Sequence, residues 1–367
     1  MSGCTILMAG GGSGGHISPG LAVAEGLERT DSRVRCLFAH SGRSIDAEML
    51  GTANRTGVPL PAVPPSLRPL RAVAFARAFA GSRRRSEQLI READVAAVVL
   101  LGGFVAAPVA AAARRLGIPR LLVNLDRVPG RANRWMRRRA TRVCSAVTTT
   151  LPFADDIVGM PIRAAAAPPG DAASCRRSLG LDPDMPTLLI TGASQGAGTI
   201  NRLMPEVARR HPELMRGWQV VHLSGRGSQE AASQAWRDAG VDATVYAFRH
   251  DMGVLWGAAD LAISRAGACS VAEITHAGVP AIYLPYPHHK DDHQRHNCMP
   301  AVEAGAACSV ADDTDTRCTM ERLVEAAGPL LARETPLHAM RAAAAASAGR
   351  NAADVIARMA LDLAGRR

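Results

Sequence analysis

A run of glycines followed directly by a histidine is the first place where this sequence could do chemistry. Gly10 to Gly15, interrupted only by Ser13, follow the apolar run Cys4–Ala9. Glycines let backbone N–H groups approach an anion closely, and a helix N-terminus favours negative charge. His16 could accept a proton there, since an imidazole titrates near neutral pH. The run predicts a phosphate-binding turn with a general base; a ligand-free turn and a surface histidine are the alternatives.

Two common nucleotide-binding motifs fit this run less well. Gly10, Gly12 and Gly15 match the G-x-G-x-x-G spacing of dinucleotide-binding domains. That motif also needs an acidic residue at the end of the second strand, and here the strand ends at Ala39-His40. No lysine follows the glycines, so the run is not a Walker A motif. An NAD-dependent oxidoreductase remains an alternative, weakened by the missing acid.

Two more glycine turns follow other predicted strands. One contains Gly102-Gly103, and the other contains Ser194, Gln195 and Gly196. Ser194 and the amides near Gly196 could hold a diphosphate without a metal. Each turn alone could serve packing, but three at strand ends in one chain favour phosphate binding.

A fourth segment, residues 264–273, runs from a strand end through a glycine into a helix. Ser270 and Glu273 fall in the first turn of that helix. The carboxylate could accept hydrogen bonds from two ribose hydroxyls. It could equally stabilise the helix start on its own.

Residues 287–297 are rich in the side chains that bind metals. His289 and His293 are four residues apart, which places them on one face of a helix. The sequence has no H-E-x-x-H motif and no distant cysteine pair to complete a set. We therefore expect a polar helix start and no metal ion.

Positive charge is concentrated in the first half of the chain. The 367 residues carry a net charge of +10, while residues 1–165 hold 23 arginines against 11 acidic residues. Within that half, residues 67–91 interleave apolar and arginine side chains, which fits docking on an anionic lipid surface. A core helix with a solvated arginine face is the alternative. A nucleic-acid partner also fits the charge, but the sequence has no recognisable nucleic-acid-binding motif.

The remaining composition describes a globular protein. Hydrophobic residues make up 47% and charged residues 21% of the chain. We expect no membrane-spanning helix and no signal peptide. The eight scattered cysteines, with no CxxC among them, are typical of reduced thiols.

The elements that must position these residues alternate between strand and helix, as in doubly wound parallel sheets. The pattern breaks over the Pro/Ala/Gly-rich residues 159–170, a predicted linker, and then restarts. A helix is expected over 19–29, and a long helical tail over 341–363. The predicted strands are 4–9, 34–39, 95–101, 119–123 and 143–148, then 187–191, 219–223, 244–248, 261–264 and 281–284. The fold class is therefore α/β, with two Rossmann-like domains facing a cleft.

In order and spacing, the motifs resemble the MurG family. These transferases add N-acetylglucosamine to the lipid-linked muramyl-pentapeptide precursor of peptidoglycan. The resemblance covers essentially the whole chain and rests on the glycine turns at 10–15, 102–104 and 192–197 and on segments 265–273 and 290–297. It implies a GT-B fold and no cofactor.

The resemblance also assigns roles to the two domains. Residues 1–163, with about 345–367 crossing back, would bind a lipid-linked diphosphate acceptor. Residues 164–344 would bind UDP-N-acetylglucosamine. The protein would act at the cytoplasmic face of the cell membrane, as a peripheral protein on an anionic surface, with no nucleic-acid partner.

Particular residues match the family's functional positions. Glu273 would bind the ribose, Gln294 the donor sugar and Ser194 the diphosphate, while His16 would be the catalytic base. The other donor-binding candidates are Ser13, Gly14, Gly15, Arg163, Gln195, Gly196, Arg249, Ala268, Cys269 and Ser270.

The sequence departs from the family at two positions. Val123-Asn124-Leu125-Asp126 stands where the family has His-Glu-Gln-Asn, so that Asp126 replaces an amide and becomes a second candidate base. Arg249 replaces an apolar residue expected beside the uracil ring. The expected reaction is an inverting displacement on the anomeric carbon of the donor. A relative of the same fold that glycosylates another lipid or a natural product is the alternative.

Overall fold

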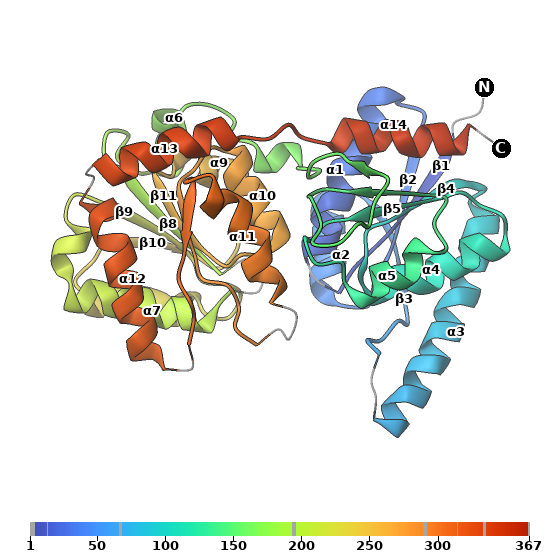
Figure 1. Ribbon diagram of the computed structural model, residues 1–367, viewed down its shortest axis with the longest axis horizontal. Helices are drawn as coiled ribbons and strands as arrows, with labels where there is room; N and C mark the ends of the chain where they lie inside the picture. The colour runs from blue at the N-terminus through green and yellow to red at the C-terminus, as the bar shows by residue number, and fades with distance from the viewer. Residues whose placement is uncertain are drawn as a thin grey trace. The chain divides into compact units, whose positions relative to one another are not determined.

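A computed structural model shows two compact α/β units, each built on one parallel sheet (Figure 1). Unit 1 comprises residues 1–163 and 350–367, and unit 2 comprises residues 164–349. The residues that the structure describes are 4–12, 14–65, 68–192, 196–288, 292–313, 315–332 and 335–365.

The sheet of unit 1 has the strand order β3-β2-β1-β4-β5-β6-β7, and every pairing is parallel. Its central strands are runs of Val, Leu, Ile and Ala buried on both faces, as helix-covered parallel strands require. The strands are β1 (Thr5–Ala9), β2 (Arg35–Ser41), β3 (Thr56–Leu60), β4 (Val95–Leu100), β5 (Arg120–Asn124), β6 (Arg142–Ser145) and β7 (Asp156–Ile157). The helices are α1 (Gly14–Thr30), α2 (Ser44–Thr52), α3 (Pro69–Glu92), α4 (Gly103–Arg115), α5 (Arg131–Arg137) and α14 (Ala353–Ala364).

Unit 2 repeats this plan with the strand order β10-β9-β8-β11-β12-β13, again all parallel. Two clusters of buried side chains lie against this sheet, one around Trp236 and one around Trp256. The strands are β8 (Thr187–Thr191), β9 (Gln219–Leu223), β10 (Ala243–Tyr246), β11 (Leu261–Ser264), β12 (Ala281–Tyr283) and β13 (Ala307–Ser309). The α-helices are α6 (Ala172–Ser178), α7 (Gly198–Arg210), α8 (Gln229–Asp238), α9 (Met252–Ala258), α10 (Ala268–His276), α11 (His293–Glu303), α12 (Thr316–Leu331) and α13 (Thr335–Ser347), with 3₁₀ turns at Ala164–Ala166 and Pro212–Met215.

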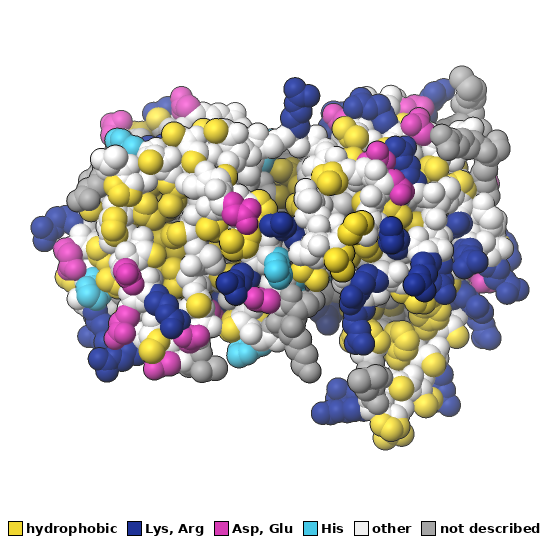
Figure 2. Space-filling model, in the orientation of Figure 1, with side chains coloured by type: hydrophobic (Ala, Val, Ile, Leu, Met, Phe, Trp, Pro, Cys, Tyr) yellow, Lys and Arg dark blue, Asp and Glu magenta, His cyan; other side chains and the backbone are white. Residues whose placement is uncertain are grey.

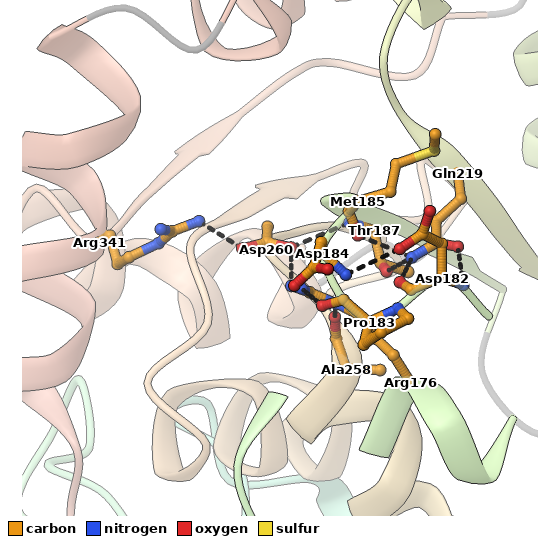
Figure 3. A network of polar contacts seen from close by, with 10 residues as sticks. All are labelled: Arg176, Asp182, Pro183, Asp184, Met185, Thr187, Gln219, Ala258, Asp260 and Arg341. Carbon is orange, nitrogen blue, oxygen red and sulfur yellow. Dashed lines mark hydrogen bonds and ion pairs between the residues drawn. The ribbon is translucent and has the colours of Figure 1, made fainter. Parts of the chain in front are cut away.

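Asp260 ties two helices of unit 2 to the amino-terminal edge of its sheet (Figure 3). Its Oδ2 accepts hydrogen bonds from Nη2 of Arg176 at 2.5 Å and from the backbone N–H of Thr187 at 2.9 Å. Its Oδ1 accepts one from Nη2 of Arg341 at 2.7 Å. Because strands β8 and β11 both begin here, their carboxyl ends meet at the opposite edge.

The two doubly wound units confirm the predicted fold class. The predicted single tail helix over 341–363 is wrong, because helices α13 and α14 are separate. Between them, Asn351 hydrogen-bonds the backbone of Ile162 through both side-chain ends, at 2.9 Å to N and 2.5 Å to O. The predicted helix over 19–29 begins earlier, at Gly14, so that Pro19 lies inside it.

The boundary between the two units falls inside the Pro/Ala/Gly-rich segment, after Arg163, and the residues that follow are ordered. Ala164–Ala166 forms a 3₁₀ turn, and a β-carbon at Gly253 of α9 would stand 2.0 Å from the carbonyl oxygen of Ala167. The segment is therefore packed against unit 2. Among the described residues, no helix combines the length and the apolar character needed to cross a bilayer.

Candidate active site

The imidazole of His16 is held between the two glycine turns of unit 1. His16 lies in the first turn of α1. A β-carbon at Gly102 would stand 3.3 Å from its Nε2, and one at Gly103 would stand 3.2 Å from its Cε1. A β-carbon at Gly10 would stand 3.2 Å from the Cβ of His16. Side chains at Gly102 and Gly103 would crowd the imidazole ring, and one at Gly10 would crowd the Cβ of His16.

The backbone conformation of the turns adds a second requirement for glycine. The φ angle is +98° at Gly102 and +77° at Gly103. Other residues pay roughly 1–3 kcal/mol in such conformations. Gly12, with φ of +91°, lies under Phe104, whose Cε1 would be 2.8 Å from an added β-carbon. The two glycine turns therefore pack directly on one another.

Asp46 of α2 is fully buried beside the first glycine turn. Its Oδ2 accepts hydrogen bonds from the backbone N–H of Gly12 at 2.8 Å and from the N–H and Oγ–H of Ser41 at 3.2 and 2.6 Å. Nη1 of Arg43 donates to the carbonyl oxygen of Gly12 at 2.5 Å. The Gly12 amide is thus bound to a carboxylate already and does not offer its N–H to a substrate phosphate.

Opposing effects set the pKa of His16. Burial lowers this pKa, while the carboxylates of Asp126 and Asp46 and a hydrogen bond with the Gly11 backbone raise it. Burial dominates, so that the pKa of His16 lies below its ordinary value. The imidazole is therefore neutral at pH 7 and able to accept a proton.

Asp126, the second candidate base, follows β5 in a segment fixed by side-chain amides. Nδ2 of Asn124 donates to the carbonyl oxygen of Asp126 at 2.7 Å and to Oγ of Ser145 at 3.0 Å. Nδ2 of Asn133 donates to Oδ1 of Asn124 at 3.1 Å. These bonds place Asp126 where its charge acts on His16. The structure thus brings together both residues that the sequence suggested as bases.

A substitution at Gly103 tests the packing of this glycine against His16, and a control at another positive-φ glycine accounts for backbone strain. We expect Gly103→Ala to lower kcat at least about tenfold, because the new methyl group would crowd the imidazole of His16, the candidate base. Gly117→Ala is the matched control: φ is +70° there, and nothing lies within 4 Å of an added β-carbon. Both variants should lose about 1–3 kcal/mol of unfolding free energy, measured in urea. Equal effects of the two variants on kcat would contradict the inference that Gly103 positions the imidazole of His16.

Two glycines, Gly192 and Gly196, follow the carboxyl end of β8 in unit 2. A β-carbon at Gly192 would stand 2.1 Å from the backbone N of Ala197. At Gly196, with φ of +72°, it would stand 2.3 Å from the carbonyl oxygen of Ser224. Only glycine fits at these two positions. Gly196 therefore lies directly on the segment that follows the neighbouring strand β9.

The amino-terminal turn of α10 lies at the same edge of the sheet, after β11. It contains Ala268, Cys269 and Ser270, all partly buried. One turn further, Oε2 of Glu273 accepts a hydrogen bond from Nε1 of Trp256 at 3.2 Å. An indole N–H is only a donor, so this contact orients the carboxylate.

Arg265 joins the segments that follow three strands of unit 2. It is 6% exposed and forms an ion pair with buried Asp312 at 2.6 Å, beyond the end of β13. Its Nη1 also donates to the carbonyl oxygen of Leu284 at 2.9 Å, just after β12. Next to this, Oε1 of Gln294 in α11 accepts a hydrogen bond from the backbone N–H of Tyr286 at 2.9 Å. One buried cation thus shapes the edge where the donor-binding candidates lie.

Arg249 is bound to its own neighbours. Its Nε and Nη2 donate to the two carboxylate oxygens of Asp251 at 2.9 and 2.5 Å, and its guanidinium lies 4.8 Å from the centre of the Tyr246 ring. The bond to Asp251 raises the pKa of Arg249 further above its already high value.

The other predicted site residues are placed as follows. Gly14 and Gly15 open α1, and Arg163 is the last residue of unit 1 before the chain enters unit 2. Ser13, Ser194 and Gln195 lie outside the described residues, as do residues 289–291 of the histidine-rich segment. Among the described residues, no group of three or more His, Cys, Asp or Glu side chains could hold a metal ion.

Sequence reasoning missed the residues that support the candidates. Asp46 is 34 positions from the glycine whose amide it binds, and Trp256 is 17 positions from Glu273. Neither pair has a local motif. Pairing of β1 with β2 brings Asp46 to the turn, so the sheet order was the missing information.

Comparisons with known proteins agree on one family. The N-terminal domain model of glycosyltransferase family 28 matches residues 6–145, and its C-terminal domain model matches residues 187–358. A relative from Frankia casuarinae is 35% identical, over 99% of this chain and 96% of its own. One from Streptomyces coelicolor is 32% identical, over 96% of each chain. Both carry the name UDP-N-acetylglucosamine–N-acetylmuramyl-(pentapeptide) pyrophosphoryl-undecaprenol N-acetylglucosamine transferase.

Solved structures give the same result. The crystal structure of Acinetobacter baumannii MurG superposes with a TM-score of 0.70 at 25% identity, covering 98% of this chain and 99% of that one. The glycosyltransferase of kitacinnamycin, at 18% identity and a TM-score of 0.63, shares the fold.

The two wound units and their glycine turns, together with these matches, define a two-domain glycosyltransferase of the GT-B class. Within that class, the chain belongs to the MurG family of N-acetylglucosamine transferases.

Proposed function

We propose that this chain transfers N-acetylglucosamine from UDP-N-acetylglucosamine to the lipid-linked muramyl-pentapeptide acceptor, converting lipid I to lipid II in peptidoglycan synthesis. Relatives with that name match nearly the full length of the chain. The donor is a UDP-sugar and the acceptor is a lipid-linked diphosphate.

The observation that carries the proposed mechanism is the packing of the His16 imidazole against the glycine turns of unit 1. Burial there lowers the pKa of His16 and favours its neutral form. In this mechanism, Nδ1 or Nε2 of His16 accepts the proton of the acceptor hydroxyl. The hydroxyl oxygen attacks the anomeric carbon as the bond to the UDP oxygen breaks, and the configuration inverts. The negative charge of Asp126 stabilises the imidazolium that forms.

The leaving UDP requires stabilisation of growing negative charge. In the proposal, the N–H groups of Ala268, Cys269 and Ser270 at the start of α10 face the phosphates. Glu273, oriented by Trp256, binds the ribose, and Gln294 contacts the donor sugar. Arg163, Gly196 and the residues from Ser13 to Gly15 complete the phosphate contacts, and Arg249 lies beside the uracil.

The experiment that tests this function measures UDP release with a lipid I analogue as acceptor. UDP-N-acetylglucosamine should be used in preference to UDP-glucose, and the product should be the β-linked disaccharide. The protein could instead bind the UDP-sugar and transfer the sugar to another lipid or natural product but not to this acceptor. That result would support a glycosyltransferase and reject the proposed acceptor.

The acceptor is lipid-linked, and helix α3 is the surface that we propose docks on the membrane. Leu70 is 88% exposed and Val73 is 52% exposed, with Arg68, Arg71 and Arg77 exposed around them. Figure 2 shows apolar and basic side chains together over this helix, at the lower right of the view. Such a surface suits the anionic cytoplasmic face of the cell membrane, and the arginines serve lipid rather than nucleic acid.

Replacing Leu70 with aspartate should weaken binding to phosphatidylglycerol-containing vesicles about tenfold, as expected for one leucine lost from the interface at ~1.5 kcal/mol. Cosedimentation at two salt concentrations measures this loss. Leu151→Asp is the matched control, because Leu151 lies outside α3 and is 73% exposed. An equal loss in both variants, or full binding to neutral vesicles, would count against α3.

A further inference from the structure

A chain of hydrogen bonds from the core of unit 2 ends after β9, at the carbonyl oxygen against which Gly196 is packed. It begins at Trp236 of α8, passes through His222 of β9 and Asn201 of α7, and ends on the carbonyl oxygen of Ser224. His222 is fully buried, and the transfer reaction described above does not use it. A buried histidine in a strand of Val and Leu calls for a physical reason.

The donor and acceptor atoms along this chain have one consistent assignment. Nε1 of Trp236 can only donate, and it lies 2.9 Å from Nδ1 of His222. The hydrogen of the neutral ring is therefore on Nε2, which lies 3.1 Å from Oδ1 of Asn201 and donates to it. Burial lowers the pKa of His222 to about 4, which keeps the ring neutral at pH 7. The amide of Asn201 is thereby oriented with Nδ2 towards Ser224, to whose carbonyl oxygen it donates at 2.7 Å.

The last atom of this chain, the carbonyl oxygen of Ser224, is also the atom against which Gly196 is packed. A β-carbon at Gly196 would stand 2.3 Å from the carbonyl oxygen of Ser224 and 2.9 Å from Cα of Gly225. The backbone N–H of Ser224 is bound to the carbonyl oxygen of Tyr246 at 3.0 Å. The backbone N–H and C=O of Ser224 are therefore both hydrogen-bonded, one to β10 and the other to Asn201.

We propose that Asn201 and His222 are positioning residues for the donor diphosphate. His222 fixes the amide orientation of Asn201, Asn201 fixes the Ser224 carbonyl, and that carbonyl sets the position of Gly196. This inference rests on the proposed function, in which Gly196 is one of the contacts of the UDP-sugar diphosphate. Neither residue touches the substrate.

The variant Asn201→Asp removes the donor of the last link and adds a negative charge, so the uncharged variant His222→Phe has to be compared with it. A carboxylate still accepts from Nε2 of His222, but it cannot donate to the Ser224 carbonyl and repels it. We expect the Kd for UDP, measured by calorimetry, and the KM for UDP-N-acetylglucosamine to rise at least about tenfold, while kcat changes less than about threefold. His222→Phe keeps a ring of similar size and removes the Nε2–H donor, so it should shift Kd and KM in the same direction by a smaller factor.

Arg209→Ala is the matched control, on the same helix but paired at the surface with Glu206. It should leave Kd, KM and kcat unchanged. Two results would overturn the inference: unchanged Kd and KM in Asn201→Asp and His222→Phe, or a loss in them that follows thermal stability alone. A wild-type protein that binds no UDP would instead overturn the proposed function itself.

Discussion

Replacing His16 with alanine should lower kcat by about 10²–10⁴-fold, the usual contribution of a general base, with little change in KM for the donor. The imidazole ring packs against Gly102 and Gly103, and burial favours its neutral form. The alanine variant loses the proton acceptor without disturbing the glycine backbone. Steady-state rates of UDP release with a lipid I analogue measure the effect.

The pH dependence of kcat gives an independent measurement. A base must be deprotonated, so kcat should fall as the pH drops through the pKa of His16. Because burial holds this pKa below the ordinary histidine value of about 6.5, the fall should lie on the acidic side of that value. The Asp126 carboxylate raises the pKa of His16, so Asp126→Asn should move the fall to still lower pH. Full turnover in His16→Ala would reject the histidine and leave Asp126 as the base.

Breaking the buried pair of Arg265 and Asp312 should cost about 3–5 kcal/mol of unfolding free energy in the variant Arg265→Met. Both side chains are less than 10% exposed, and removal of the guanidinium leaves a carboxylate buried without its counter-charge. The segments after β11, β12 and β13 also lose their common contact. The urea midpoint and slope of unfolding measure the loss.

The neighbouring carboxylate supplies the control. Asp313 pairs with Arg322 at 2.5 Å, and both side chains are close to half exposed. Arg322→Met should therefore cost less than about 1 kcal/mol. The double variant Arg265→Met/Asp312→Leu should recover much of the loss, since no lone charge remains buried. Similar costs for the two single variants would show that burial does not govern this pair.

The wound sheets could be predicted because their central strands are uninterrupted apolar runs. Val95–Leu100 and Thr187–Thr191 have no other stable place than a sheet covered on both faces. Of the edge strands, β10 was predicted, but β3, β7 and β13 were not. Strand β3, Thr56–Leu60, contains a proline and is mostly exposed, while β7 and β13 have only two and three residues. Pairing with a neighbouring strand, rather than local preference, makes these segments extended.

The candidate site was likewise predictable from the sequence only in part. The glycine turns were visible because several glycines at a strand end form a local pattern. The partners of those turns were not visible: Asp46 reaches Gly12, and Asn201 reaches Ser224, only after parallel pairing has set neighbouring strands side by side. Arg265 was noticed for its position before α10, but its partner Asp312 is 47 positions away, so its burial could not be foreseen.

The last helix of the chain belongs to the first unit, and this has a consequence for synthesis. Helix α14 packs along α1: Arg29 pairs with Asp354 at 2.6 Å, and Gly26 leaves room for the carbonyl oxygen of Ala353. On the ribosome, unit 2 is a continuous stretch and can finish folding before residues 350–367 emerge. Unit 1 is therefore the first unit to be synthesised in part and the last to be complete. Until then the face of α1 that receives α14 is uncovered, so a chain cut short before α14 would leave this face exposed to water.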